Sequence, residues 1–420
     1  MSVLEPYSSY RPAPADWLGP IPAHWQARPL WSMFRRVKDI EHPDEPMLSV
    51  FRDYGVVPKA SRPNLNVTAE NRDIYQLVDP GWLVTNRMKA WQGSVGVSTL
   101  RGIVSGHYIC FAPDHHEHAA YLNYLFRSVA YIDGYHLISR GVRVGQAEID
   151  NNLYRLLPVL VPPLAEQQAI AAYLDQETAQ IDALIGKQGE LIATLRERRK
   201  SVVARTLLRG LDPEVRTASD GSSALGPIPA HWSVVPSRYL CTITTGDEDS
   251  GNATEDGEYP FYIRGREILR IGHFTFDCEA VMTPGDGQGG TGKVFHYTNG
   301  KFVAHQRVYV FTEFRAILGW YFYYFLSTFL RPVALAGSNT VTMESLRRPL
   351  LADFKVALPP VDEQRRIAAY LDEQTAKIDA LISKAEHFIE LAKERRAALI
   401  TAAVTGQIDV RATTSAGEGV

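Results

Sequence analysis

The sequence predicts an α/β (α+β) protein with a pseudo-two-fold internal repeat, in which two copies of one domain are separated by a pair of long antiparallel coiled-coil helices. Three observations predict this fold class. Two short sequence frames each occur twice, the stretches between them differ, and each copy of the second frame opens a long segment without proline. Such repeats have to be identified first, because the fold assignment depends on them.

The first frame, called the opening frame below, is Leu-Gly-Pro-Ile-Pro-Ala-His-Trp at residues 18–25, and it returns unchanged at residues 225–232. Its prolines fix the backbone dihedral φ, and its tryptophan offers a large side chain to pack against. The frame therefore predicts a rigid extended segment that leads into each domain.

The second frame, the helix frame, begins with Pro-Pro and continues with Glu-Gln, Ile-Ala-Ala-Tyr-Leu-Asp and Ile-Asp-Ala-Leu-Ile, at residues 162–185 and 359–382. Proline and glutamate favour the first turn of a helix. A seven-residue repeat with charged outer faces follows, which is typical of a coiled coil. Its edge is expected at Leu174, Ile181, Gln188, Leu195 and Val202 and at Leu371, Ile378, Ala385, Ala392 and Leu399, flanked by Ile170, Leu184, Leu191, Ile367, Leu381 and Phe388.

These patterns predict the order of the parts along the chain. The first domain with its opening frame is expected at residues 1–157, the first long helix at 158–211, and a linker rich in Asp, Pro, Ser and Gly at 212–224. The second domain, the second long helix and a disordered tail are expected at residues 225–354, 355–410 and 411–420.

The two inserts between the frames share little sequence but follow a similar order of elements. Strand-like runs at 81–85 and 107–111 match runs at 293–297 and 307–311. We expect a helix to begin at Asp114, whose carboxylate can cap it, and another helix around Ile317–Leu330. A related glycine turn follows Gln92 in the first insert and Gln288 in the second. The inserts are therefore predicted to be divergent copies of one domain.

The composition indicates a globular protein of the cytoplasm. The chain has 420 residues, of which 45% are hydrophobic and 22% charged. Its three scattered cysteines favour a reducing compartment, and Cys110 is expected to be a buried strand residue. The N-terminal stretch has no apolar signal core, and the aromatic run Leu318–Leu330 is too short to span a bilayer. Since the net charge is −3, any DNA contact has to come from local basic clusters or from partners.

The doubled order of opening frame, variable domain and helix frame resembles the specificity subunit of type I restriction-modification enzymes over essentially the whole chain. The resemblance rests on the Pro-Pro…Glu-Gln helix motif at residues 162–167 and 359–364, which is highly specific when doubled. It implies that each variable domain is a target recognition domain that reads one half of a split double-stranded DNA sequence. It also implies that the helices set the spacing and bind two modification (methyltransferase) subunits, and indirectly restriction subunits with nuclease and translocase activity.

The resemblance implies a chain without catalysis or cofactors of its own. S-adenosylmethionine, and ATP with magnesium in the restriction complex, are expected on partner subunits. The sequence agrees, because it has no Asn/Asp-Pro-Pro-aromatic tetrapeptide, with which an adenine methyltransferase grips a flipped base. We therefore expect a subunit that is not an enzyme and has no catalytic residues.

Two patterns imitate other sites. Residues 287–293 have the spacing of a phosphate-binding loop, but Val294 replaces the magnesium-binding hydroxyl and a strand-like run follows, so a glycine turn is favoured. The cluster His115-His116-Glu117-His118 looks like a metal site but lacks further convergent ligands, so a solvated helix turn is favoured.

Two charged runs, 197–200 and 394–396, recur at the same height of the two helices. They fit either solvated helix faces or contacts with phosphate or partner proteins.

Asn, Gln, Arg and Lys side chains on loops form paired hydrogen bonds with base edges, although most polar contacts to DNA position the protein rather than specify a sequence. The candidates for DNA binding are Asn86, Lys89, Gln92, Arg140 and Arg143 in the first domain and Arg264, Arg266, Gln288, Lys293, Arg307 and Asn339 in the second.

The alternative hypothesis is a coiled-coil scaffold whose α/β domains bind proteins rather than DNA. It accounts for the helices and the near-neutral charge. It does not account for two divergent domains held in identical frames, which is the arrangement that reading two unrelated half-sites requires.

Overall fold

A computed structural model describes residues 5–61, 72–141, 147–218, 225–286, 291–336 and 345–411. The chain folds into two compact units, unit 1 from residues 1–188 and 387–420 and unit 2 from residues 189–386. Each unit contains one insert and one end of both long helices. The predicted boundaries instead treat each long helix as a segment separate from the domains. Most of the predicted tail, and residues 219–224 of the predicted linker, lie outside the described residues.

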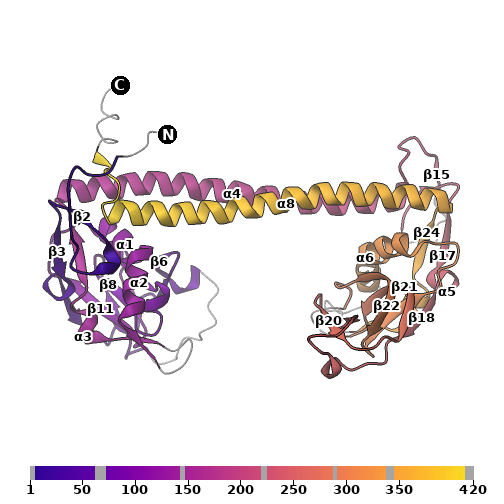
Figure 1. Ribbon diagram of the computed structural model, residues 1–420, viewed down its shortest axis with the longest axis horizontal. Helices are drawn as coiled ribbons and strands as arrows, with labels where there is room; N and C mark the ends of the chain where they lie inside the picture. The colour runs from indigo at the N-terminus through magenta and orange to yellow at the C-terminus, as the bar shows by residue number, and fades with distance from the viewer. Residues whose placement is uncertain are drawn as a thin grey trace. The chain divides into compact units, whose positions relative to one another are not determined.

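Unit 1 is built around a four-stranded antiparallel sheet in the order β4-β11-β8-β9, with helices α1 and α2 packed beside it (Figure 1). The sheet contains β4 (Phe34–Val37), β11 (Tyr108–Pro113), β8 (Leu83–Asn86) and β9 (Val95–Val97), and the helices are α1 (Ala119–Arg127) and α2 (Val129–Leu137). Smaller pairs are β1 (Tyr10–Arg11) with β2 (Ile21–Pro22), β3 (Gln26–Pro29) with β14 (Pro158–Val161), β5 (Leu48–Phe51) with β6 (Gly55–Pro58), β7 (Gln76–Val78) with β10 (Gly102–Val104), and β12 (Ser139–Arg140) with β13 (Glu148–Ile149). Short helical turns are η1 (Asp16–Leu18), η2 (Leu30–Ser32), η3 (Lys59–Ser61), η4 (Ala90–Gln92) and α3 (Asn151–Tyr154).

Unit 2 has a six-stranded sheet in the order β18-β23-β21-β22-β19-β20, and α6 packs against β21 and β22. Its strands are β18 (Thr242–Thr245), β23 (Val308–Thr312), β21 (Phe276–Pro284), β22 (His296–Ala304), β19 (Tyr259–Tyr262) and β20 (Ile268–Ile271). Two further pairs are β15 (Thr217–Ala218) with β16 (Ile228–Pro229) and β17 (Ser233–Pro236) with β24 (Lys355–Leu358). The helices are α5 (Ser237–Leu240), η5 (Ser250–Asn252), α6 (Gly319–Ala336) and α7 (Arg348–Ala352).

The two units share the sheet core β4-β11-β8 and β18-β23-β21, which confirms the predicted fold class and the divergent copies. The predicted strand at 293–297 is wrong in detail, because β22 begins only at His296. The strand that pairs with β23 at this place in the sheet is β21. Its Asp277 and Glu279 interrupt the apolar pattern, so the sequence does not predict this strand.

The helix predicted from Asp114 is also wrong at its start. Helix α1 begins at Ala119, where the His118 side chain accepts a hydrogen bond from the Tyr121 amide. The side-chain oxygen of Gln167 accepts one from the His118 amide. A side chain from a distant part of the chain thus sets the first residue of this helix, and local sequence patterns do not report it.

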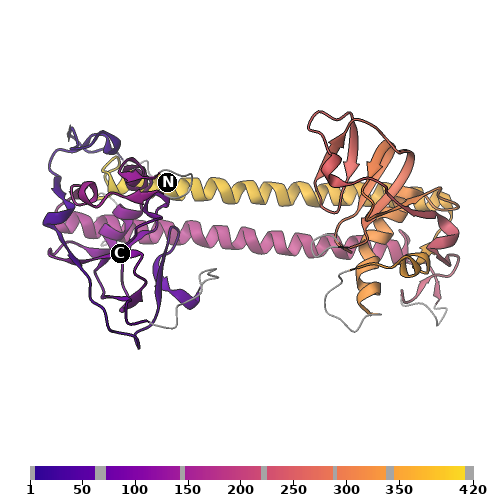
Figure 2. The ribbon, with the colours of Figure 1, turned by 90° about the horizontal axis from the view of Figure 1, so that it is seen from below.

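Two helices, α4 (Leu164–Arg209) and α8 (Val361–Val404), contain 46 and 44 residues. They lie side by side within each unit (Figure 2). In unit 1 Arg396 pairs with Asp182 at 3.0 Å, and in unit 2 Arg199 pairs with Asp379 at 2.9 Å. Residues late in one helix therefore meet residues early in the other, which confirms the antiparallel packing.

The seam between these helices follows the predicted seven-residue repeat at Leu174, Ile181 and Leu195, which are buried. Of the predicted flanking row, Ile170 and Ile367 are buried, but the other four residues are not. Leu184, Leu191, Leu381 and Phe388 are between 42% and 50% exposed, and Ile192 and Ile382 are buried instead. Ile192 and Ile382 stand four positions after a residue of the predicted edge and pack into the seam. The three leucines and Phe388 stand three positions after an edge residue and point away from the seam.

Each unit has its own hydrophobic core. In unit 1 it joins Trp25, aromatic residues of α1 and α2, and Val404 at the end of α8. In unit 2 it joins Trp232, aromatic residues of α6, and Leu207 near the end of α4. Among the described residues, no helix combines the length and the apolar character that a membrane crossing requires.

Candidate nucleic-acid interface

The repeated frames meet at a buried glutamate. In unit 1 the Glu166 carboxylate accepts hydrogen bonds from the Trp25 indole at 2.9 Å and the Tyr7 hydroxyl at 2.5 Å, and lies 2.9 Å from His24 Nε2. Burial and the bond to Glu166 raise the pKa of Tyr7, which keeps its hydroxyl a donor. The Glu of the helix frame therefore holds the His-Trp of the opening frame.

Unit 2 repeats this arrangement. Glu363 accepts a hydrogen bond from the Trp232 indole at 3.1 Å and lies 2.9 Å from His231 Nε2. Because the same side chains form the same contacts in both units, the letter-for-letter repeat of the sequence is explained by structure rather than by chemistry at a site.

Two further polar residues of the helix frame, a glutamine and an aspartate, attach each insert to its long helix. The side-chain oxygen of Gln167 accepts from the His118 amide, and that of Gln364 accepts from the Leu318 amide, each at 2.9 Å and just before an insert helix. Asp175 accepts from the Tyr124 hydroxyl at 2.7 Å.

The corresponding Asp372 accepts from the Tyr324 hydroxyl at 2.7 Å and from the Trp320 indole at 2.9 Å. The helix frame therefore docks two different inserts through the same polar groups. Any property that distinguishes the inserts has to lie on surfaces away from these contacts.

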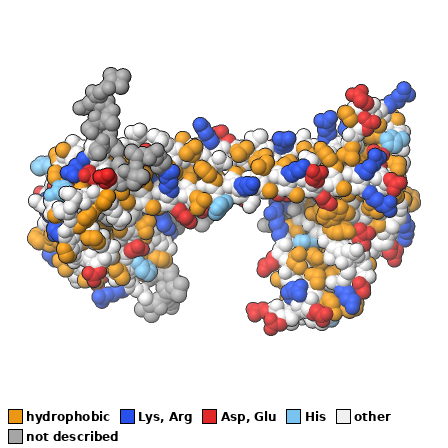
Figure 3. All heavy atoms as spheres, turned by 45° about the horizontal axis from the view of Figure 1, so that its top comes forward, with side chains coloured by type: hydrophobic (Ala, Val, Ile, Leu, Met, Phe, Trp, Pro, Cys, Tyr) orange, Lys and Arg blue, Asp and Glu red, His pale blue; other side chains and the backbone are white. Residues whose placement is uncertain are grey.

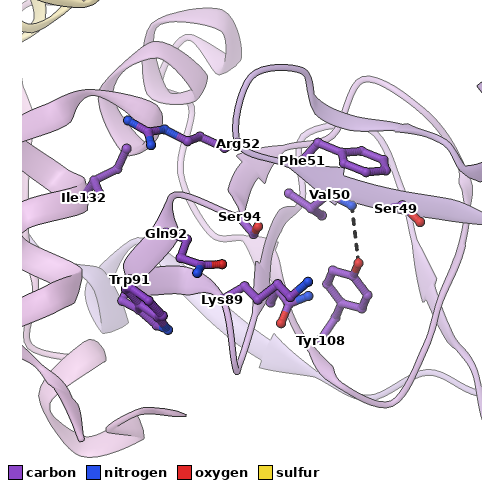
Figure 4. A pocket seen from close by; sticks show the side chains of 11 residues that line it. Ser49, Val50, Phe51, Arg52, Lys89, Trp91, Gln92, Ser94, Tyr108 and Ile132 are labelled. Atoms are coloured by element: carbon purple, nitrogen blue, oxygen red, sulfur yellow. Dashed lines mark hydrogen bonds between the residues drawn. The ribbon is translucent and has the colours of Figure 1, made fainter. Parts of the chain in front are cut away.

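Unit 1 has a pocket on such a surface, between the β5–β6 hairpin and the turn that joins β8 to β9 (Figure 4). We call it the turn pocket. Its volume is about 600 Å³, which is within the usual range of ligand-binding sites. Its lining residues are Ser49, Val50, Phe51, Arg52, Asn86, Lys89, Trp91, Gln92, Ser94, Tyr108 and Ile132.

Three of the predicted DNA-binding residues meet in the turn pocket. Lys89 and Gln92 are exposed and extend from the turn toward a common space, with Tyr108 opposite (Figure 4). Asn86 uses its side-chain oxygen to accept from the Met88 amide at 3.1 Å, so it supports the turn.

The pocket is also lined by Arg52, Trp91 and Tyr108, which are not among the residues predicted from the sequence. Arg52 comes from a hairpin far from the turn in sequence, and no local pattern connects the two.

Another candidate of the first domain, Arg140, does not line this pocket. Arg140 is exposed on β12 and its Nε lies 3.8 Å from the Asp150 carboxylate. Arg143 lies outside the described residues.

In unit 2, Arg264 and Arg307 converge on Asp286, at 3.6 and 3.1 Å. Arg266 and Lys293 are exposed, and Gln288 and Asn339 lie outside the described residues. The candidates of unit 2 thus include one charged cluster in which the cations are already paired.

Lys293 is followed by strand β22 rather than by the helix of a phosphate-binding loop, and residues 287–290 of that motif are not described. Residues 115–118 precede α1, so the interpretation of the histidine cluster as a helix turn is wrong. Burial lowers the pKa of His115, which keeps its ring neutral. Among the described residues no group of three metal-ligating side chains converges.

The two charged runs, 197–200 and 394–396, contribute Arg199 and Arg396 to ion pairs between the helices. Neither a solvated helix face nor a contact with phosphate or a partner protein includes this role. Charges of both signs are interspersed with apolar side chains over the face seen in Figure 3.

Comparison with known proteins gives consistent similarities. The sequence model of a family described as the type I restriction modification DNA specificity domain matches residues 229–390. The EcoDI specificity subunit of Escherichia coli is 31% identical over 183 residues, which cover 44% of this chain and 40% of that subunit. A putative type I specificity subunit, MjaX, of Methanocaldococcus jannaschii is 24% identical over 312 residues, or 69% of this chain and 68% of the relative. The chain thus spans less than half of the EcoDI subunit and about two thirds of MjaX.

Two solved structures share the fold. One, from a study of the assembly and conformational transition of the type I R-M system, aligns with a TM-score of 0.70 at 14% identity, over 91% of this chain and 98% of the other. The HsdS subunit of Thermoanaerobacter tengcongensis aligns with a TM-score of 0.51 at 15% identity, over 94% of this chain and all of the other (100%). At these identities the likeness concerns the fold.

Proposed function

Because this chain belongs to the family of type I restriction-modification specificity subunits, we propose that it selects the DNA sequence on which partner subunits act, each unit reading one half of a bipartite double-stranded target. The observation that carries the proposal is the pair of identical frame contacts around two different inserts. One attachment geometry with two different surfaces fits a protein that reads two unrelated half-sites.

The chemistry is assigned to partners. We place methyl transfer, with S-adenosylmethionine, on modification subunits, and ATP with magnesium on restriction subunits where they join. This chain contributes recognition without catalysis or a cofactor of its own. We place its action in the cytoplasm.

The modular part of the proposal is tested by exchanging residues 26–157 for the insert of a related chain. Methylation mapping of the assembled enzyme should show one half of the target changed and the other half kept. A target that changes in both halves, or in neither, would contradict the assignment of one half-site to each insert.

The long helices offer equivalent surfaces for two modification subunits. Leu184 in unit 1 and Leu381 in unit 2 occupy the same position of the repeat, and both are about half exposed. Leu191 follows Leu184 on α4, and Phe388 follows Leu381 on α8, so each helix carries a matching row of exposed apolar side chains. An exposed apolar patch of this kind favours docking of a partner. We expect two modification subunits per chain.

Native mass spectrometry of the co-expressed complex tests this stoichiometry. Leu184→Asp or Leu381→Asp should leave one modification subunit bound, and the double variant none. The matched control is Lys187→Glu, at an exposed and charged residue of the same helix, and it should keep both subunits. A persistent one-to-one complex of the unaltered chain would contradict the stoichiometry.

The helices also set the spacing between half-sites in this proposal. At about 1.5 Å per residue, lengthening both helices in register by roughly four to seven residues adds about 6–10 Å to each. We expect the unread spacer to grow by a few base pairs, at about 3.4 Å each, while both half-site sequences stay the same. Full activity with an unchanged spacer would show that the helices do not set it.

A further inference from the structure

The turn pocket carries positive charge and no negative charge. Arg52 and Lys89 are its charged lining residues, and none of the 11 residues that line it is Asp or Glu. Within the described part of the chain, neither side chain has a hydrogen bond or ion pair. Arg87, which lies next to the pocket in sequence, is by contrast paired with Glu148. The pocket therefore offers two available cations to an anionic ligand.

The turn that presents Lys89 and Gln92 is held by its own backbone. The Gln92 and Ser94 amides donate to the Lys89 carbonyl at 3.0 and 3.1 Å. Gly93 has φ of +88°, and a Cβ atom there would lie 2.8 Å from the Ile132 side chain. Only glycine fits this turn without strain, so the backbone from which the two side chains extend is held in place before a ligand arrives.

Gln92 differs from its neighbours in chemistry. Its exposed amide makes no side-chain hydrogen bond to any described residue, whereas the Asn86 oxygen is occupied by the Met88 amide. A free glutamine amide carries a donor and an acceptor, and this pair matches the major-groove edge of adenine. The lysine carries donors only and fits phosphate, which positions the DNA without specifying its sequence.

We propose that the turn pocket is the place where unit 1 reads one base pair of its half-site, with the Gln92 amide on the base edge and Lys89 and Arg52 on neighbouring phosphates. This inference rests on the proposed function of the chain. The resemblance to the family does not say which residue specifies the base or which residues position the DNA. Trp91 and Tyr108 form walls of the pocket, and Asn86 supports the turn.

The test uses the full chain assembled with its modification subunits and a random-sequence duplex library, with methylated products sequenced. For Gln92→Ala, discrimination at one base pair of the half-site assigned to residues 26–157 should fall by about 5- to 150-fold, since one paired base contact contributes roughly that factor. Gln92→Glu should disfavour adenine at the same position and favour cytosine, because a carboxylate accepts a hydrogen bond from the cytosine amino group. All other positions of the target should be unchanged.

Lys89→Ala tests the phosphate role. It should weaken all duplexes alike and reduce the slope of log affinity against log salt by about one, with the preferred sequence unchanged. The matched control is Gln26→Ala, an exposed glutamine on β3 of the same unit, outside the turn pocket, which should leave both the target and the affinity as they were.

The outcomes separate the inference from the proposed function. If Gln92→Ala and Gln92→Glu both fold and keep the complete target, or lose affinity for all sequences equally, Gln92 does not read a base and the inference is overturned while the bipartite target of the unaltered chain stands. If the pocket instead binds free deoxynucleotides tightly and Gln92→Ala abolishes that binding alone, the inference is overturned as well. If the unaltered assembly methylates no bipartite sequence, the proposed function itself fails.

Discussion

Single buried side chains carry the contacts that the repeated sequence encodes. Glu166 and Glu363 receive the indoles of Trp25 and Trp232, yet their surroundings differ, because the Glu166 side chain is 4% exposed and the Glu363 side chain 16%. Unit 1 also adds the Tyr7 hydroxyl as a donor to Glu166. The same frame residue therefore contributes more to stability in unit 1.

Replacing these glutamates should show the difference. Glu166→Ala leaves the buried Trp25 and Tyr7 donors unpaired, and at about 1–3 kcal/mol for each donor the variant should lose roughly 2–6 kcal/mol of local stability. Glu363→Ala should lose less, because it leaves one buried donor unpaired, the Trp232 indole, instead of two. Hydrogen-exchange mass spectrometry of peptides around each tryptophan measures both, and equal protection loss in the two units would contradict this ranking.

The cysteines provide a second measurement at the residue scale. Burial raises the pKa of Cys110 and of Cys241 to about 12, so at pH 8 only roughly one thiol in ten thousand is the reactive thiolate. The pKa of Cys278 is also raised, but this thiol is only partly buried. Iodoacetamide should therefore modify Cys278 first in the native protein, and modify all three within the same time after denaturation. Rapid native labelling of Cys110 would contradict its burial in the sheet.

The long helices show how one residue separates packing from docking. Ile192 is buried in the seam, whereas its neighbour Leu191 is about half exposed. Ile192→Ala should cost about 2–5 kcal/mol of unfolding free energy, since it opens a cavity in the seam, and Leu191→Ala should stay within about 0.5 kcal/mol. Denaturant unfolding of the two variants measures this. Similar losses for both would mean that Leu191 also packs within the chain.

At the scale of the whole molecule, the ends of the described chain come together in unit 1. The Asp409 amide donates to the Glu5 carbonyl at 2.9 Å, and the Tyr10 hydroxyl donates to the Gly406 carbonyl at 3.0 Å. In unit 2 the corresponding path, from the end of α4 through residues 210–218 to β15, is a continuous chain. The connection from the end of a long helix to the first short strand is thus covalent in unit 2, whereas hydrogen bonds between the two chain ends replace it in unit 1.

A circular permutant should therefore fold. Joining Arg411 to Glu5 through a short glycine-serine linker, and opening the chain within residues 219–224, keeps every contact described in unit 1 and unit 2. We expect methylation mapping of the permutant, assembled with its partners, to give the target of the natural order. An insoluble chain, or loss of either half of the target, would show that the natural order of the segments is required.

The sequence by itself determined the repeat, the antiparallel helices and the fold class, because identical frames and a seven-residue repeat are local patterns whose physical meaning does not depend on distant residues. Only the tertiary structure decided where α1 begins, since Gln167 caps it from another helix, and which leucines lie outside the seam. It alone brought Arg52 to Lys89 and Gln92, because a pocket between a hairpin and a turn depends on how separate strands pack, which no spacing in the sequence records.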